Sequence, residues 1–374
     1  VLFRSYKGEN MINLRKLGLT ALAGSLAAVS AQAGEMSVSG SHITTYTTGD
    51  AGVVENTHSS NSVGSNTNLT LSGSGDLDNG WSVSTFVAMN DATTGLSSSA
   101  ATMTMGSMGT VGVSKVGGFN VNGAYDETYP RAYEENSDAG GQSSLNSVGN
   151  WADDNAIIYQ APAIDLMGAS INVGVEHSLQ AGTGTGGDGV GAARSDTYGS
   201  GTGVGVTVAY EGLTLGAYGA ERENKNPTVV DDVQDEFNGS WFVNYNFGPV
   251  SVGYQETYFD SGLTHATNDL TTTAVRTVGT SGGIFEGEAM SIAFNVNDNL
   301  SISYSEVEDT YDAQSNVKGG TESDDVTQKT ESLQVAYSMG SMSVKAYSTE
   351  TSNPNFDSDA AKLNVNEIAL GLAF

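Results

Sequence analysis

The last 13 residues of the chain, Lys362–Phe374, restrict its fold more than any other stretch. Every second residue from the end is large and apolar (Phe374, Leu372, Leu370 and Ile368), and the residues between them are small or charged. A period of two predicts a β-strand with one apolar face and one polar face. Because the polar face is small and the chain stops on an aromatic residue, we expect the apolar face to meet lipid and the small face to meet a wet lumen. This is the pattern of a β-barrel that crosses a membrane.

The composition fits a wall of strands between lipid and water. Charged residues make up 15% of the 374 residues, well below the roughly 25% of a soluble domain. Hydrophobic residues make up only 38%, and because no run of about 18 apolar residues occurs, we expect no membrane-spanning helix. Serine, threonine, asparagine and 48 glycines fill the difference, as strands that face lipid and water alternately require.

The start of the chain predicts export. A short basic region precedes an apolar run of 13 residues, Leu17–Val29, and Ala31-Gln32-Ala33 forms a small-residue cleavage site. Because the run is too short to span a bilayer, we interpret Met11–Ala33 as a secretory signal peptide. Residues 1–10 precede a plausible initiator methionine, and we expect them to be a non-native upstream extension. The barrel is then expected over residues 34–374.

Sixteen stretches of the mature part share the strand period, and together they predict an all-β, antiparallel, up-and-down barrel. The predicted strands are Glu35–Thr47, Ser65–Leu77, Trp81–Met89, Ala100–Met105, Thr110–Val116, Asn155–Ala161, Gly168–His177, Thr202–Tyr210, Leu213–Glu221, Phe237–Phe247, Val250–Tyr258, Phe285–Val296, Leu300–Glu308, Gln328–Met339, Ser341–Glu350 and Lys362–Phe374.

The connections between these strands alternate in length. Short turns such as Asp78-Asn79-Gly80 and Glu211-Gly212 are typical of tight hairpins. Long connections stand between the hairpins, and the third of them, residues 117–154, is the longest. Several carry acidic pairs, such as Asp231-Asp232 and Asp324-Asp325. Short turns on one side and long loops on the other are the asymmetry of outer-membrane barrels.

Other classes of function find little support. A net charge of −29 disfavours nucleic acid, which needs basic patches. The chain has no cysteine, and none of its four histidines stands at a metal-ligand spacing, so we expect no metal or cofactor. No Gly-x-Ser-x-Gly motif stands on a predicted strand-to-helix turn, and we do not expect an enzyme. Weak binding of Ca²⁺ or Mg²⁺ by acidic loops stays open.

Four stretches carry a resemblance in their order and spacing. They are Met36-Ser-Val-Ser-Gly40 after the signal peptide, Leu69–Trp81, Asn155–Pro162 before Gly168, and the terminal Phe374. In these stretches, and in the layout of nearly the whole mature part, the chain resembles the Gram-negative general porins. That resemblance implies sixteen-stranded barrels that assemble as homotrimers in the outer membrane. It also implies contact with lipid and lipopolysaccharide and insertion by the barrel-assembly machinery, with the terminal residues Phe374, Leu372 and Leu370 as the assembly signal.

The resemblance also implies that the third loop folds into the lumen and narrows the pore. Its charged residues would then form the constriction: Asp126, Glu127, Arg131, Glu134, Glu135 and Asp138. On the barrel wall, strand parity makes Lys345 and Glu367 the candidates that face the lumen. Because few other basic residues have this parity, the sequence departs from the basic wall of the family.

We therefore expect a water-filled channel for passive diffusion of small hydrophilic solutes and ions, with a preference for cations. The alternative is a secreted β-rich structural or adhesive surface protein, such as a sandwich module. It would also explain the signal peptide, the acidity and the richness in serine and threonine. It would not explain the terminal phenylalanine or the alternation of short and long connections.

Overall fold

Strands and turns make up most of the computed structural model, which describes residues 34–51, 61–91, 95–139, 141–182, 198–225, 234–263, 272–315 and 322–374. Seventeen strand segments occur there: β1 (Met36–Ala51), β2 (Asn61–Asp76), β3 (Ser82–Asn90), β4 (Gly95–Thr104), β5 (Thr110–Lys115), β6 (Ala156–Gln160), β7 (Ile164–Leu166), β8 (Ala169–Ser178), β9 (Tyr198–Tyr210), β10 (Leu213–Asn224), β11 (Glu236–Phe247), β12 (Val250–Asp260), β13 (Ile284–Asn297), β14 (Leu300–Asp312), β15 (Val326–Met339), β16 (Met342–Ser352) and β17 (Leu363–Ala373). Five 3-10 turns accompany them in this part of the chain: η1 (Gly106–Met108), η2 (Asn122–Ala124), η3 (Ser144–Asn146), η4 (Asn150–Ala152) and η5 (Pro354–Phe356). The predicted extension 1–10, the predicted signal peptide 11–33 and the acidic pair Asp231-Asp232 lie outside the described residues.

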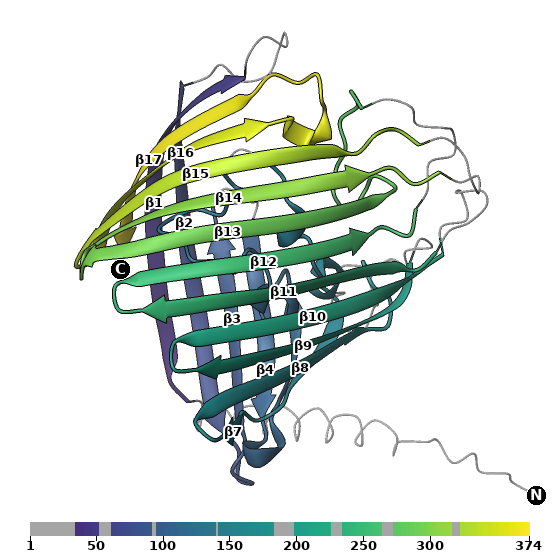
Figure 1. Ribbon diagram of the computed structural model, residues 1–374. Coiled ribbons are helices and arrows are strands. Elements are labelled where there is room, and N and C mark those ends of the chain that lie inside the picture. Colours follow the sequence, from purple (N-terminus) through teal and green to yellow (C-terminus); the bar gives the residue numbers. More distant parts are fainter. Residues whose placement is uncertain are drawn as a thin grey trace, which may run out of the picture.

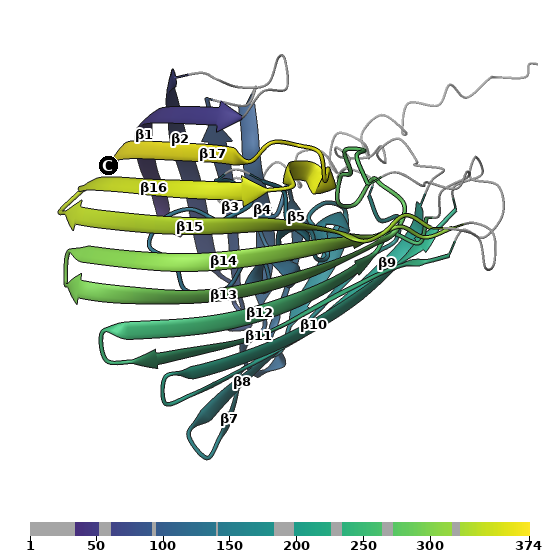
Figure 2. The ribbon, with the colours of Figure 1, turned by 45° about the horizontal axis from the view of Figure 1, so that its top comes forward.

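The strands form one closed antiparallel sheet. Neighbours in sequence pair with each other, and β1 closes the ring by pairing with β17, from Ser41 opposite Ala373 to Ala51 opposite Leu363. Figures 1 and 2 show the strands as one continuous wall. A closed sheet has no unpaired edge, which is what a membrane-spanning sheet requires. The closed ring excludes the two-sheet sandwich that the sequence left as an alternative.

One barrel strand is broken into two segments. β6 and β7 both pair with β8, and the break between them contains Pro162. Proline has no N–H to donate to the ladder, so a strand that contains it is interrupted there. The sequence predicted that this strand ends at Ala161, whereas the structure continues it over Ile164–Leu166. With β6 and β7 counted as one strand, the barrel has sixteen strands, as predicted.

The short turns follow from residues that accept left-handed backbone. Glu211 and Gly212 between β9 and β10 have φ angles of +45° and +87°. Two consecutive positive φ values define the type I′ turn that suits the twist of a two-residue hairpin. Met167 and Gly168 between β7 and β8 repeat this geometry with φ angles of +52° and +89°.

Most strands are longer than predicted at the end that leads to the long loops. β9 begins at Tyr198 rather than Thr202, and β2 begins at Asn61 rather than Ser65. The additional residues are largely glycine, serine and asparagine, which have weak strand propensity. Pairing with the neighbouring strand overrides that propensity, for example where Ser62 lies opposite Thr47 of β1.

One face of the wall is apolar and points outward. The predicted outward residues of β17 are exposed: Ile368 by 52%, Leu370 by 42% and Leu372 by 43%. Residues directly opposite one another share a face, so Val344 of β16, which lies opposite Leu370, points outward as well. In water such a surface would be costly, whereas in hydrocarbon it is the expected lipid-facing band.

The other face is polar, yet much of it is covered. Gln255, Ser305 and Thr351 point toward the lumen from β12, β14 and β16, yet each is fully buried and none is exposed to water there. The connection between β5 and β6 covers two of them, because Gln255 donates to the carbonyl of Tyr125 at 2.5 Å and Ser305 donates to Asn136 Oδ1 at 2.8 Å. No helix in the described part of the chain is both long enough and apolar enough to cross a membrane.

Candidate functional site

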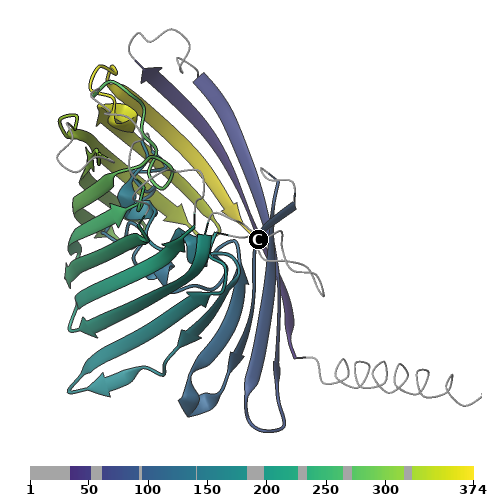
Figure 3. The same cartoon turned by 90° about the vertical axis from the view of Figure 1, so that its right-hand side faces the viewer.

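The connection between β5 and β6, residues 116–155, lies against the inward face of the wall. It contains η2, η3 and η4, and η3 contacts β12 and β13 while η4 contacts β8 and β9. Figure 1 shows its turns behind the strands, and Figure 3 shows them on the inner side of the wall. Val116 and Gly117 have positive φ angles of +53° and +68°, which direct the chain away from β5. This course is consistent with the predicted fold of the third loop into the lumen.

Two buried carboxylates of the wall hold the loop, one near its start at Val121 and one at Ser144 in its second half. Glu176 of β8 accepts hydrogen bonds from the backbone N–H of Val121 at 2.7 Å and from the hydroxyl of Tyr218 at 2.5 Å. Asp309 of β14 accepts from the backbone N–H of Ser144 at 2.8 Å. Both carboxylates are 0% exposed. Hydrogen bonds from N–H groups to carboxylates are stronger than neutral ones, so these contacts fix the loop's path.

Polar wall side chains also bind the middle of the loop. The backbone N–H of Ala132 donates to Ser303 Oγ and that of Tyr133 to Gln334 Oε1, each at 2.8 Å. Gln334 in turn donates to the carbonyl of Glu134 at 2.7 Å. The loop therefore finds on the wall the partners that its non-regular backbone cannot provide for itself.

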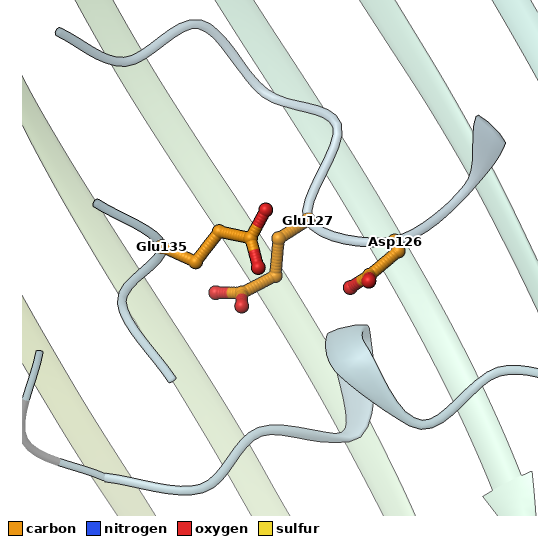
Figure 4. Close-up of side chains that lie close together, drawn as sticks. All are labelled: Asp126, Glu127 and Glu135. Carbon is orange, nitrogen blue, oxygen red and sulfur yellow. The ribbon is translucent and has the colours of Figure 1, made fainter. Parts of the chain in front are cut away.

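Three loop carboxylates come together, as Figure 4 shows for Asp126, Glu127 and Glu135. One carboxylate oxygen from each lies within 4.8 Å of the others. Arg131 donates to the main-chain carbonyl of Glu127 and forms an ion pair with Glu135. One guanidinium thus faces three acids, so the cluster keeps an excess of negative charge.

The three acids have different environments. Glu127 is 0% exposed and accepts hydrogen bonds from the Tyr129 hydroxyl at 2.8 Å and the Ser137 N–H at 3.2 Å, so it supports the loop from within. Asp126 and Glu135 are half-buried. Asp126 Oδ1 is buried and, within the described part of the chain, has no hydrogen-bond donor.

These environments raise the pKa values of the loop carboxyls. Burial, and then the negative charges of Glu135 and Glu127, raise the pKa of Asp126 to about 7. Burial raises the pKa of Glu135 as well, although the charge of Arg131 opposes the shift. Glu134 is half-buried, and its burial raises its pKa. Asp138, the last predicted acid of the loop, is exposed.

The two predicted wall residues, Lys345 and Glu367, both contact the same loop side chain, Tyr133. The Tyr133 hydroxyl donates to Glu367 Oε1 at 2.8 Å, and Thr47 donates to the other oxygen of Glu367 at 2.7 Å. Lys345 Nζ lies 4.9 Å from the centre of the Tyr133 ring. Lys345 and Glu367 therefore lie on the inward face, and both are engaged by the tip of the loop.

The part of the wall formed by β1 to β4 is not covered in this way. The loop's side-chain hydrogen bonds to the wall reach β8, β11, β12, β14, β15 and β17. Inward side chains under the loop are buried, such as Ser240 and Gln328, whereas Asn68 and Thr70 of β2 are half-exposed. The open part of the lumen accordingly lies between the loop and β1 to β4.

Sequence reasoning missed the wall residues that position the loop. Glu176 and Asp309 have the inward parity of Gly174 and Ser305. A single acid at an inward position among small residues is a signal that could have identified them. Nothing local to Tyr133 predicts its position, because Glu367 is 234 residues away in sequence.

Comparison with known proteins agrees with this architecture. A family model described as Gram-negative porin matches residues 18–298. Salmonella typhi OmpF in complex with daunomycin aligns with a TM-score of 0.65 at 11% identity, over 91% of this chain and 98% of that chain. The anion-selective porin from Comamonas acidovorans gives 0.60 at 14% identity, over 91% and 99%. The outer membrane channel DcaP of Acinetobacter baumannii gives 0.59 at 13% identity, over 92% and 98%. No curated protein matches the sequence.

At these identities the likeness to solved structures shows the fold, while the family model shows membership because it covers most of the chain. Family and fold together point to a channel rather than to an enzyme. They also agree with the outward apolar band, which places the barrel in the outer membrane. The chain belongs to the Gram-negative porins, and the protein is an outer-membrane channel.

Proposed function

We propose that the channel lets small hydrophilic solutes diffuse passively and prefers cations over anions. The observation that carries this proposal is the uneven charge of the loop inside the barrel. Asp126, Glu134 and Glu135 are half-buried and Asp138 is exposed, whereas the one base among the predicted constriction residues, Arg131, is paired with Glu135. Carboxylates beside a narrow aqueous path attract cations and repel anions.

The wall adds little positive charge to oppose these carboxylates. Among the described inward-facing strand residues, only Arg222 and Lys345 are basic. Arg222 is buried and paired with Glu236 of β11. Lys345 lies over the Tyr133 ring, next to Glu367. Each base therefore has a local acid or ring partner, and anions gain no free cationic track.

Family membership does not decide the sign of the selectivity, because one structural neighbour is described as an anion-selective porin. The acid-rich loop of this chain supports a preference for cations, and a salt-gradient measurement tests it. Protein comprising residues 34–374 in a planar bilayer should show a cation-selective reversal potential. Asp126→Asn, Glu134→Gln and Glu135→Gln together should shift that potential clearly toward zero.

A matched control removes three exposed acids at the short turns, with Asp78→Asn, Glu211→Gln and Asp298→Asn. This variant should keep the reversal potential of the unmodified channel. An anion-selective potential in the unmodified channel, or equal shifts in both triple variants, would contradict the proposed role of the loop.

We also propose a homotrimer, since the family and a Vibrio cholerae OmpT neighbour described in its trimer form support that assembly. At the seam of the barrel, Phe374 exchanges backbone hydrogen bonds of 2.9 and 2.8 Å with Gly40, while the residue as a whole is 71% exposed. Together with Leu372 and Leu370 it offers an exposed apolar ridge at the chain end. This ridge suits recognition by the barrel-assembly machinery, and the outward band suits lipid and lipopolysaccharide.

A further inference from the structure

The wall that faces the open lumen has a chemistry of its own. On β2 the inward positions from residue 66 to residue 74 all carry side chains that donate and accept hydrogen bonds: Asn66, Asn68, Thr70, Ser72 and Ser74. On β1 the inward positions from residue 37 to residue 47 carry serine and threonine except at Ile43. Within the described part of β1 to β4, no inward position carries lysine, arginine or histidine.

Serine and threonine carry this polar surface on to β3 and β4, where Phe86, Ala88 and Ala100 also point inward. Ser84 of β3 and Thr102 of β4 share a hydrogen bond of 2.7 Å, and Thr104 shares one of 3.0 Å with Thr110 of β5. A hydroxyl has one donor and two acceptor sites, so such a bond leaves capacity for a further partner. We call the serine, threonine and asparagine side chains on the inward faces of β1 to β4 the hydroxyl wall.

The open lumen is therefore bounded by two different surfaces. The loop, held against β8 to β15, presents half-buried and exposed carboxylates, as at Glu135 and Asp138. The hydroxyl wall opposite presents neutral groups that both donate and accept. Figure 3 shows β1 to β5 facing the loop-bearing part of the wall. A solute in this space meets negative charge on one side and hydrogen-bonding neutral groups on the other.

We infer that the channel favours amino sugars, a class of solute with an ammonium group and several hydroxyl groups on one ring. The inference rests on the proposed cation preference and adds to it the hydroxyl wall as a second determinant. The ammonium group meets the loop carboxylates, while the sugar hydroxyls exchange their hydrogen bonds with water for bonds to serine, threonine and asparagine. The two inward-facing bases on the described strands add little net positive charge, because Arg222 is paired with Glu236 and Lys345 lies over the Tyr133 ring next to Glu367.

The test compares two cations of the same charge, glucosaminium and cyclohexylammonium. Cyclohexylammonium is smaller and has no hydroxyl group, so a pore that selects only on size and charge passes it faster. We expect bi-ionic reversal potentials to show glucosaminium as the more permeant cation. Asn68→Leu, Thr70→Val and Ser98→Ala together, all on the hydroxyl wall, should lower the permeability ratio about threefold, as for the loss of one net hydrogen bond.

The control makes the same kinds of change on the lipid-facing side, with Asn366→Leu, Thr85→Val and Ser99→Ala. It should keep the ratio of the unmodified channel. Faster passage of cyclohexylammonium, or an equal ratio in the wall variant and the control, overturns the inference. If one of these two results occurs while the potential in potassium chloride is cation-selective, only the amino-sugar inference fails. An anion-selective potential in potassium chloride means that the proposed function itself fails.

Discussion

The hydroxyl of Tyr133 donates a hydrogen bond of 2.8 Å to the carboxylate of Glu367, which lies on the strand that closes the barrel. This bond joins the tip of the loop to the seam between β17 and β1. It also limits how far the tip can move into the open lumen, because the neighbouring backbone of the loop is held from the other side by Gln334.

Replacing Tyr133 with phenylalanine should therefore loosen the tip while keeping the ring beneath Lys345. A hydrogen bond to a charged group is worth about 1.5–3 kcal/mol, and Glu367 keeps its bond from Thr47, so we expect a loss of about 1 kcal/mol in the free energy of unfolding. Single-channel recordings should show greater current noise in the open state. Tyr245→Phe, an outward-facing substitution, serves as control. Equal noise in both variants would show that the bond does not restrain the tip.

The two buried wall carboxylates should matter more for the loop. Asp309→Asn replaces a buried carboxyl acceptor that binds the N–H of Ser144 and the hydroxyl of Ser143 at 2.8 Å each. Loss of charge-assisted bonds at a buried site predicts a cost of about 2 kcal/mol. The end of the loop near η3 should then become accessible to protease added to the purified channel. Asp298→Asn, at an exposed turn, should leave the proteolysis pattern unchanged, and so would Asp309→Asn if the loop's path were independent of the wall.

The strands could be predicted from the sequence because their period is local. Ile368, Leu370 and Leu372 reveal their outward face from spacing alone, and the structure confirms the barrel and its strand count. The continuation of the strand past Pro162 was not predictable from the local sequence, because proline favours the end of a strand. Pairing of Ile164–Leu166 with β8 extends the strand nonetheless.

The loop could be predicted only in outline. Its length and acidity marked it, but its shape depends on contacts across the barrel, such as the bond between Tyr133 and Gln334, which are 201 residues apart. Composition alone also could not separate Glu127, which is buried within the loop, from Glu135, which is half-buried beside Arg131. Side-chain parity has no meaning in a segment without a regular period, so the sequence gives no rule for this distinction.

The raised pKa of Asp126 predicts that selectivity depends on pH. With a pKa of about 7, Asp126 is mostly ionised above that pH and mostly protonated below it. Lowering the pH from about 8 to about 6 should reduce cation selectivity. Asp126→Asn should show the low-pH selectivity already at the higher pH, and a flatter profile. Glu135, Glu127, Arg131 and Asp153 are the charged groups that act on Asp126, and they are unchanged in this variant.

The raised pKa of Asp126 also determines how the free energy of unfolding changes with pH. The pKa of Asp126 is higher in the folded protein than the value of about 3.9 in an unfolded chain, so the folded state binds more protons between these values. The free energy of unfolding attributable to Asp126 should rise as the pH falls from about 7 toward about 4. Thermal unfolding in detergent should show a smaller rise for Asp126→Asn than for the unmodified protein. A rise of equal size would assign the pH dependence to other groups.

Lys329 should stabilise an outward row of acids by holding two of them. Its Nζ lies 2.6 Å from Glu306 and 3.2 Å from Glu308, and Glu308 stands directly opposite Glu288 on the next strand. Like charges directly opposite one another destabilise a sheet, so Lys329→Met should lower the free energy of unfolding. Because these side chains are partly exposed, the expected loss is only about 0.5–1 kcal/mol. The midpoint of thermal unfolding in detergent should fall, and added salt should restore part of the loss by screening the carboxylates.

Lys362→Met, which removes a more exposed pair with Glu350, should have the smaller effect. A loss that salt does not change would assign the role of Lys329 to packing of its aliphatic chain instead.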